Sequence, residues 1–516
     1  MSTASGKGKG IEPGAASGSA AGAAERAAPN GKPGAAPGNA AGAAERAAPN
    51  GKPGAASGKG NGTASASLRE KILYSFGDVG SNFVWTFTSS FLVLYYTDSA
   101  LISAAFVGSM MFFTRVFDAG SDLVMGLVIE KTRTRFGKAR PWVAFGAGPL
   151  ALSLVLVFNV PSTWSPVAKN GYVFATYFLL AVVCYTAVNL SYHAMLARIT
   201  LVQHERAVIS VYRVVITLFA VLGISFATPV LLDRLGGSRA QGAWTGTSAI
   251  FAVLAVVFLL TCFIGTSEKV PVQAHSAAGA GRTPVKVALR FLLRTKYFYL
   301  TAFLNIVMTT FNGVMGGYVY FARDVLGNVD LFGVLSACTL LPIIVVAPLM
   351  PPVFKRLGKR NTILVGMALS VIACAVQLAA PSSVLLAVIT MSARAAGLAP
   401  LMTASATFPG DIVDYMQWKT GVRAEGLVSS TASFGAKLGT GLGSALLGWL
   451  LAAGGYDGAA DVQLPSAINA EIAAVVGVPL TVCALCLVGM YFWDIDKYRP
   501  AIDRFLAEAK SAAPRD

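Results

Sequence analysis

Two aspartates within an apolar stretch are the residues of this sequence best suited to hold a cation. Asp118 and Asp122 are four residues apart, so on a helix they share one face, with Arg115 one turn earlier. Each carboxylate in a membrane span costs about 2.5–3.5 kcal/mol on insertion scales unless a cation, a proton or a base neutralises it. We therefore predict a cation site at this pair. The alternative is a permanent ion pair with Arg115 and Lys437 that only holds helices together.

The composition predicts an all-α membrane protein with many spans. Of the 516 residues, 55% are hydrophobic and only 13% are charged, whereas globular domains carry about 25% charged residues. Apolar runs long enough to cross a bilayer recur throughout, and we count twelve between residues 72 and 493. The net charge of +16 does not indicate nucleic-acid binding, because the bases cluster in short loops between apolar runs.

The chain divides into five parts, and its repeat supports two six-helix halves. After the second expected span it reads RTRFGKARPW (133–142), and after the eighth FKRLGKRNTI (354–363). A parallel duplication would produce this interval. Alternating basic loops place both termini in the cytoplasm. The expected parts are a disordered low-complexity tail (1–67), an N-terminal bundle (68–265), a cytoplasmic linker (266–296), a C-terminal bundle (297–498) and a cytoplasmic C-terminal tail (499–516).

No pattern in the sequence points to catalysis or to an organic cofactor. There is no Walker A motif, zinc signature, GxSxG or kinase set, so we do not expect an enzyme. The six cysteines lie in apolar segments, and we interpret them as small core residues. The N-terminus has no secretory signal peptide pattern.

Several motifs resemble one transporter family. RVFDAGSDLVMG (115–126), TRTRFGKARPW (132–142) and GDIVDYMQWKTGVRAEG (410–426) occur in family order between about residues 70 and 498. Together with YSFGDVGSNF (74–83) they make the chain similar to the glycoside–pentoside–hexuronide:cation symporters. This resemblance implies the major facilitator fold of twelve helices.

The resemblance also implies how the cation site is built. In the family the two aspartates bind Na⁺, H⁺ or Li⁺, and we expect Ser121 and Thr186 to add oxygens, since hard cations want several. The lysine matching Lys437 faces the pair, and we predict that it competes with the ion. The alternative is a snorkelling or purely structural lysine. Ser121 stands where the family type has asparagine, which makes H⁺ at least as plausible as Na⁺.

A polar face on the fourth span suits a sugar. Tyr185, Asn189 and His193 recur every four residues, and amide, imidazole and phenol groups bind sugar hydroxyls and ring faces. Asn189 and Asn82 stand where galactoside transporters of the family have acidic acceptors. The loss of both acids argues against galactoside specificity in this chain. The expected substrate contacts are completed by residues on other spans: Asp78, Arg115, Arg213 and Ser433.

We assign two charged loops to gating rather than to substrate. Salt bridges between such loops can close one state and break in the other; the alternative is a solvated loop. The expected gating residues are Arg133, Arg135, Gly137, Lys138, Arg140, Asp411, Asp414, Arg423 and Glu425.

The expected function is symport of a sugar or glycoside with Na⁺ or H⁺ across the bacterial inner membrane. Its partners are the lipid bilayer, the substrate and the coupling cation. Two alternatives stay open. A sodium-dependent transporter of a lysophospholipid or other amphipathic substrate fits the Asn82 and Asn189 departures and the intramembrane Arg213. A uniporter or a non-transporting sensor is the other.

Overall fold

The computed structural model describes residues 67–200, 202–268, 294–405, 407–420 and 425–511. Over these residues the chain is helical, and an isolated bridge between Thr134 and Gly137 is the only β pairing. The all-α prediction is confirmed. The predicted N-terminal tail and most of the predicted linker lie outside the described residues.

The first helices follow the chain from the end of the tail to the linker. They are α1 (Leu68–Leu94), α2 (Ala104–Lys131), α3 (Arg140–Val157), α4 (Pro166–Phe178), α5 (Tyr185–Ile199), α6 (Gln203–Arg234) and α7 (Gln241–Gly265). We call these the N-terminal set. A π-helical segment, Leu179–Cys184, joins α4 to α5, so that Pro166–Ile199 forms one continuous span.

The remaining helices form the C-terminal set. They are α9 (Lys296–Val314), α10 (Gly317–Tyr320), α11 (Leu331–Val346), α12 (Met350–Leu357), α13 (Lys359–Ala379), α14 (Val384–Ser405), α15 (Phe408–Thr420), α16 (Glu425–Ala453), α17 (Pro465–Ile472), α18 (Val478–Tyr491) and α19 (Arg499–Ser511). Further π-helical turns follow α1, α10 and α17 at Tyr95–Ser99, Phe321–Val325 and Ala473–Gly477.

Nine helical segments within the described residues are long and apolar enough to cross a membrane, or ten if the bent pair of α9 with α10 and its π turn is one span. The 28-residue α2 is not among them, because it carries the charged residues of the site. The 27-residue α1 is not among them either. If α1 and α2 are added to the ten candidate spans, the total is twelve. The number of twelve spans stays a prediction.

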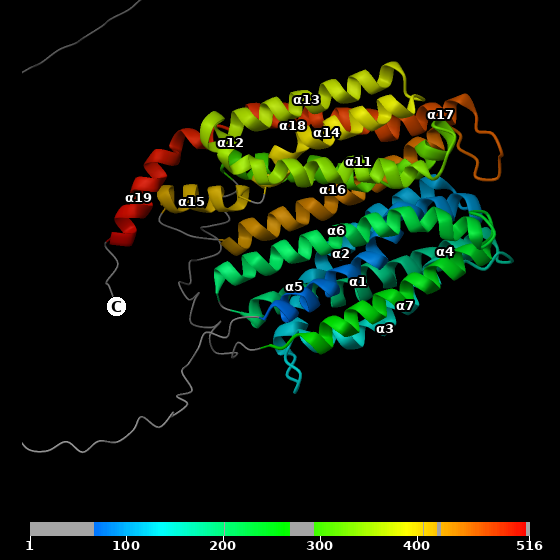
Figure 1. Ribbon diagram of the computed structural model, residues 1–516, viewed down its shortest axis with the longest axis horizontal. Coiled ribbons are helices and arrows are strands. Elements are labelled where there is room, and N and C mark those ends of the chain that lie inside the picture. The colour runs from blue at the N-terminus through cyan, green and yellow to red at the C-terminus, as the bar shows by residue number, and fades with distance from the viewer. Residues whose placement is uncertain (1–66, 201, 269–293, 406, 421–424, 512–516) are drawn as a thin grey trace, which may run out of the picture. The chain divides into compact units, whose positions relative to one another are not determined.

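Each set packs mainly within itself, and most of the contact between the sets is made by two helix pairs, with a smaller contact between α1 and α10. Helix α1 packs against α6 and α7, and α13 against α14 and α18, whereas α2 packs against α16 and α6 against α11 (Figure 1). Glycine permits a close contact between α2 and α16: a Cβ on Gly448 of α16 would collide with the backbone carbonyl of Ala104 on α2.

Glycines also start the two repeated basic turns. Gly137 has φ of 112° and Gly358 has φ of 79°, values that side-chain-bearing residues rarely adopt. Helix α3 begins three residues after Gly137, and α13 begins directly after Gly358. The repeated Gly-Lys in the sequence therefore corresponds to a left-handed residue that turns the chain into the next span.

Candidate functional site

The two aspartates of α2 meet the lysine of α16 at the boundary between the two helix sets. Lys437 Nζ lies 2.9 Å from Asp118 Oδ1 and 2.7 Å from Asp122 Oδ2. It also donates to the Asp118 backbone carbonyl at 2.9 Å. Arg115, one turn earlier on α2, lies 3.3 Å from Asp118 Oδ2. Spacing along α2 therefore brings three charges together, and the contact with α16 adds the fourth.

Hydroxyl groups complete the surroundings of Asp118. Thr186 donates to Asp118 Oδ1 at 2.8 Å, and Ser121 donates to the Asp118 backbone carbonyl at 2.9 Å. The two hydroxyl oxygens are 3.4 Å apart. Thr186 is the second residue after the π-helical segment, and its hydroxyl also donates to Ala181 O, five residues back. Carboxylate, hydroxyl and carbonyl oxygens thus converge, which is the donor set that a hard cation requires.

The cluster is electrically balanced as it stands. Two carboxylates face two bases, and the side chains of Asp118 and Arg115 are only 6% and 8% exposed. Asp122 and Lys437 are more open, at 29% and 21%. Among the described residues no group of three or more His, Cys, Asp or Glu converges as a metal site. A cation here would therefore rely on the two carboxylates and neighbouring hydroxyls, and would compete with Lys437.

A cavity of about 440 Å³ lies beside this cluster, and we call it the inner cavity. Tyr185, Asn189 and His193 of α5 all line it, so their four-residue spacing does put them on one wall. Ser433 of α16 lines the same cavity, together with the charged cluster and Trp85 of α1. The ring of Trp85 lies 5.0 Å from that of Tyr185 and carries the Arg115 guanidinium at 4.1 Å. Aromatic faces and neutral polar groups therefore share one wall.

Two expected substrate residues lie behind the wall instead of on it. Arg213 Nη1 is 3.0 Å from His193 Nδ1, and its Nε is 3.8 Å from Asp78 Oδ2. Thr217 donates to the same Asp78 oxygen at 3.0 Å. Neither Asp78 nor Arg213 lines the inner cavity, so they reach it through His193.

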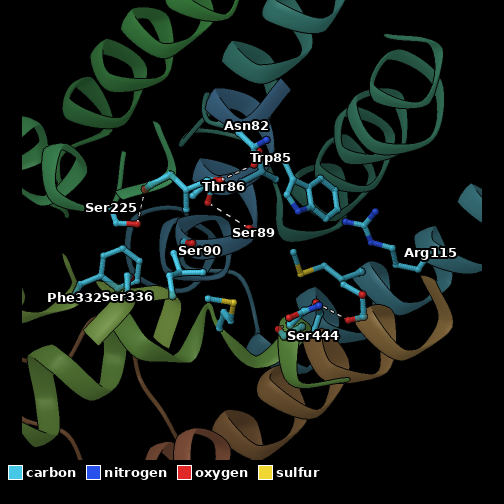
Figure 2. Close-up of a pocket in the computed structure, with 18 of the residues that line it drawn as sticks. Asn82, Trp85, Thr86, Ser89, Ser90, Arg115, Ser225, Phe332, Ser336 and Ser444 are labelled. Atoms are coloured by element: carbon cyan, nitrogen blue, oxygen red, sulfur yellow. Dashed lines mark hydrogen bonds between the residues drawn. The ribbon is translucent and has the colours of Figure 1, made fainter. Parts of the chain in front are cut away.

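Asn82 lies one helical turn beyond Asp78 on α1 and faces a second cavity. Its amide nitrogen donates to the Asp78 backbone carbonyl at 2.9 Å, and its Oδ1 accepts from Thr86 at 3.3 Å. This second cavity, of about 280 Å³, we call the outer cavity; Figure 2 shows Asn82 and Trp85 on its wall. The structure therefore separates Asn82 from Asn189, since they line different cavities.

The basic loop after α2 is held by an acid that the sequence did not single out. The Glu268 carboxylate accepts backbone N–H bonds of 2.8–3.0 Å from Lys138, Ala139 and Arg140 at the start of α3. The Arg140 side chain donates to the backbone carbonyl of Phe263 in α7. All these contacts stay within the N-terminal set. Arg133 and Arg135 are exposed, and Gly137 makes the turn.

The other predicted gating residues also pair within their own set. Lys359 lies 2.5 Å from Asp411, and Arg499 lies 3.2 Å from Asp411 and 3.4 Å from Asp414. Arg423 and the side chain of Glu425 lie outside the described residues. The described members of the predicted lock thus hold the loops of each set separately, at the end of the helices where α2 finishes.

A second group of polar contacts between the sets lies at the opposite end. Asp98, after α1, lies 2.5 Å from Arg323, after α10, and its side chain is 3% exposed. Tyr456 donates to Asp98 at 2.8 Å and accepts from Arg323 at 2.6 Å. The hydroxyls of Thr97 and Tyr320 are 2.8 Å apart. This end, which we call the closed end, is therefore sealed by a buried polar network.

Sequence reasoning missed the closed end, Glu268 and Trp85. Asp98 and Arg323 are 225 residues apart and lie in π-helical turns at the ends of spans, so neither is conspicuous alone. A signal existed for Trp85: it is one of seven tryptophans, and three residues before it on the same helix stands Asn82. The 3.6-residue period puts the two on one face.

Comparison with known proteins agrees with the fold and the motifs. Residues 73–497 match the family model described as "MFS/sugar transport protein". The isoprimeverose transporter of Lactiplantibacillus pentosus is 33% identical over 84% of this chain and 89% of its own. The glucuronide carrier protein homolog of Escherichia coli (strain K12) is 30% identical over 83% and 93%.

A solved structure supports the architecture at lower identity. The D-xylose-proton symporter superposes with a TM-score of 0.59 at 14% identity, covering 83% of this chain and 98% of that one. That likeness concerns the fold alone. With a family model that spans most of the chain and relatives at 30% identity or above, the chain is a member of the MFS/sugar transport protein family, among the glycoside–pentoside–hexuronide:cation symporters of the major facilitator superfamily.

Proposed function

We propose that this protein carries a sugar or glycoside across the bacterial inner membrane together with a cation, by alternating access. One observation supports the proposal most strongly: Lys437 of α16 occupies both carboxylates of α2, across the boundary between the helix sets. Because Lys437 neutralises the aspartate pair from the other helix set, a change in the charge of the pair changes the contact between the sets, and the reverse also holds.

The charge balance gives the coupling step. Two acids and two bases already sum to zero, so a cation entering between Asp118 and Asp122 would leave one excess positive charge in a largely buried site. The ion is favoured only when Lys437 moves away. Ion binding therefore loosens the contact of α2 with α16, and the freed Lys437 is then available to the inner cavity. The same argument holds for Na⁺ and for a proton on either carboxylate.

The inner cavity supplies the substrate site. Tyr185, Asn189 and His193 offer hydrogen bonds and an aromatic face. The names of the relatives concern isoprimeverose, a glucuronide and glycosides, which support a sugar or glycoside here. The same names give the lysophospholipid alternative no support. Arg213, behind His193, would fix the imidazole and favour substrates with an acceptor group near it.

The proposed topology follows from the loops. The basic loop 131–140 belongs in the cytoplasm by the positive-inside rule, which puts the closed end on the periplasmic side and both termini inside. The bundles 68–265 and 297–498 would be the two rocking units, joined by the linker 266–296. In this assignment the structure is an inward-open state, in which the cytoplasmic lock is parted and each of its loops pairs within its own bundle.

A binding experiment tests the proposal before the sugar is identified. The purified protein is screened by thermal shift against mono- and disaccharides, glucuronides and lysophospholipids, with and without Na⁺ and at two pH values. A ligand at a hundred times its Kd stabilises the folded state by about 2.7 kcal/mol. We expect a sugar shift that grows with Na⁺ or changes with pH, and that loses this ion dependence in Asp122→Asn. A sugar shift independent of any ion would favour a uniporter, and a shift with lysophospholipid alone would overturn the sugar assignment.

A further inference from the structure

The outer cavity shares its floor with the inner cavity. Four residues line both: Trp85, Arg115, Asn312 and Thr440. In Figure 2 the ring of Trp85 and the guanidinium of Arg115 face each other at the side of the outer cavity, 4.1 Å apart. The two cavities therefore adjoin at this pair.

The wall of the outer cavity is rich in neutral polar groups from both helix sets. Ser89 comes from α1 and Ser225 from α6, while Ser336 comes from α11 and Ser444 from α16. Among the described residues that line it, Arg115 alone carries a charge, and it is already bound to Asp118 and to the Tyr177 hydroxyl. This described part of the wall therefore offers no free base to attract an anion.

The hydrogen bonds of the wall specify what the ligand must bring. Ser89, Ser225 and Thr440 each donate their hydroxyl proton to a backbone carbonyl of their own helix, at 2.9–3.3 Å. Ser444 does the same at 3.2 Å. A hydroxyl group that already donates its hydrogen to one acceptor can still accept hydrogen bonds through its oxygen lone pairs. These four hydroxyls can therefore accept a hydrogen bond from a ligand, which a sugar hydroxyl can donate and a carboxylate cannot.

One further group supports a ligand here. Thr88 lines the outer cavity with a side chain that is 3% exposed, and its hydroxyl has no hydrogen-bond partner among the described residues. A buried hydroxyl without a partner is costly, by about 1–3 kcal/mol on mutational scales. Because this oxygen is itself buried, a ligand hydroxyl would satisfy it only after the Thr88 side chain turns toward the cavity.

We infer that the outer cavity is a second substrate subsite, which takes one uncharged, hydroxyl-bearing ring of a two-ring glycoside whose other ring lies in the inner cavity. The volume of about 280 Å³ is near the lower limit of ligand pockets, roughly 300–1,000 Å³, which suits a single ring. Trp85 borders both cavities at the junction. This inference rests on the proposed function, and it makes the protein selective for disaccharide-sized substrates.

The test compares two substitutions at one position of the full-length protein. Ser336→Leu fills part of the outer cavity, while Ser336→Ala removes only the hydroxyl. The Ser336 side chain is 3% exposed, and none of the described residues that line the inner cavity comes from α11. Affinities are measured by calorimetry for glucose, xylose and galactose, and for isoprimeverose, melibiose, cellobiose and lactose. Ser225→Leu repeats the test from the other helix set.

We expect Ser336→Leu to weaken the bound disaccharide at least tenfold, to leave the best monosaccharide within twofold, and Ser336→Ala to stay within threefold for both. Retained monosaccharide binding shows that the variant is folded, and Ser225→Leu is expected to give the same pattern. Equal losses for one-ring and two-ring sugars, or no loss with either leucine variant, would overturn the second subsite while leaving the proposed function intact. A wild-type protein that binds none of these neutral sugars would overturn the second subsite, while the wider thermal-shift screen with glucuronides would still decide the proposed function.

Discussion

Replacing Lys437 with glutamine isolates the competition between lysine and ion. The substitution removes a charge whose Nζ lies 2.9 and 2.7 Å from two carboxylates, and leaves one negative charge in excess. Breaking a fully buried pair costs about 3–5 kcal/mol. Asp122 and Lys437 are 29% and 21% exposed, so solvent screens part of their interaction. We therefore expect the loss of the lysine charge to cost about 1.5–3 kcal/mol. At 1.4 kcal/mol per tenfold, cation affinity should rise roughly 10- to 100-fold.

The assay is a titration of the purified variant with Na⁺ and Li⁺, and separately with protons, followed by thermal shift. For whichever ion the wild type binds, the half-saturating concentration in Lys437→Gln should fall by one to two orders of magnitude. Lys437→Arg is the matched control, because it keeps the charge, and should stay near wild type. An ion affinity that is unchanged or weaker in Lys437→Gln would refute the idea that lysine and ion share one place.

Three further predictions concern the gate, a loop and the helix contact. Arg323→Ala removes the base at the closed end and leaves Asp98, which is 3% exposed, without its cation. An unpaired buried group costs about 1–3 kcal/mol, so the variant should populate states open at that end more often, and maleimide should label a cysteine placed there faster. Unchanged labelling would argue against a gate. Glu268→Gln weakens three N–H bonds at the start of α3 and should cost about 0.5–2 kcal/mol in thermal stability, whereas no loss would mean that water replaces the cap. Gly443→Ala puts a methyl group against a backbone carbonyl of α9 and should lower the free energy of unfolding by about 1–3 kcal/mol. Gly126→Ala is the control: with no described neighbour within 4 Å, it should be neutral or stabilising. Similar melting temperatures for the two variants would contradict the packing.

The charged cluster could be predicted from the sequence because local rules determine most of it. The four-residue spacing of Asp118 and Asp122 sets their common face, and the cost of charge in lipid demands a partner. Lys437 was the conspicuous base in an otherwise apolar span. The same local period put Tyr185, Asn189 and His193 on one wall, since all three follow the π-helical segment and none spans it.

Features that depend on contacts across the chain could not be predicted. Asp98 and Arg323 are ordinary charges at the ends of spans, and only the fold brings them 2.5 Å apart. Asp78 and Arg213 have the residue types of a substrate site, yet they lie behind His193, because helix rotation decides which side of a wall a side chain occupies. The outer cavity is lined by residues from both helix sets. Its position and size depend on how the two sets pack together, which no local residue pattern predicts.

In the proposed mechanism, the aspartate pair couples ion binding to sugar movement. The most direct measurement is uptake of a bound sugar into proteoliposomes under an imposed Na⁺ gradient and, separately, an imposed pH gradient, with wild type and Asp122→Asn side by side. Asp122→Asn keeps the shape of the side chain and removes one charge that pairs with Lys437 at 2.7 Å. We predict that wild type accumulates sugar against its gradient under one of the two ion gradients. Asp122→Asn should still exchange sugar across equal concentrations and yet accumulate none. Accumulation by Asp122→Asn at the wild-type level would contradict the account.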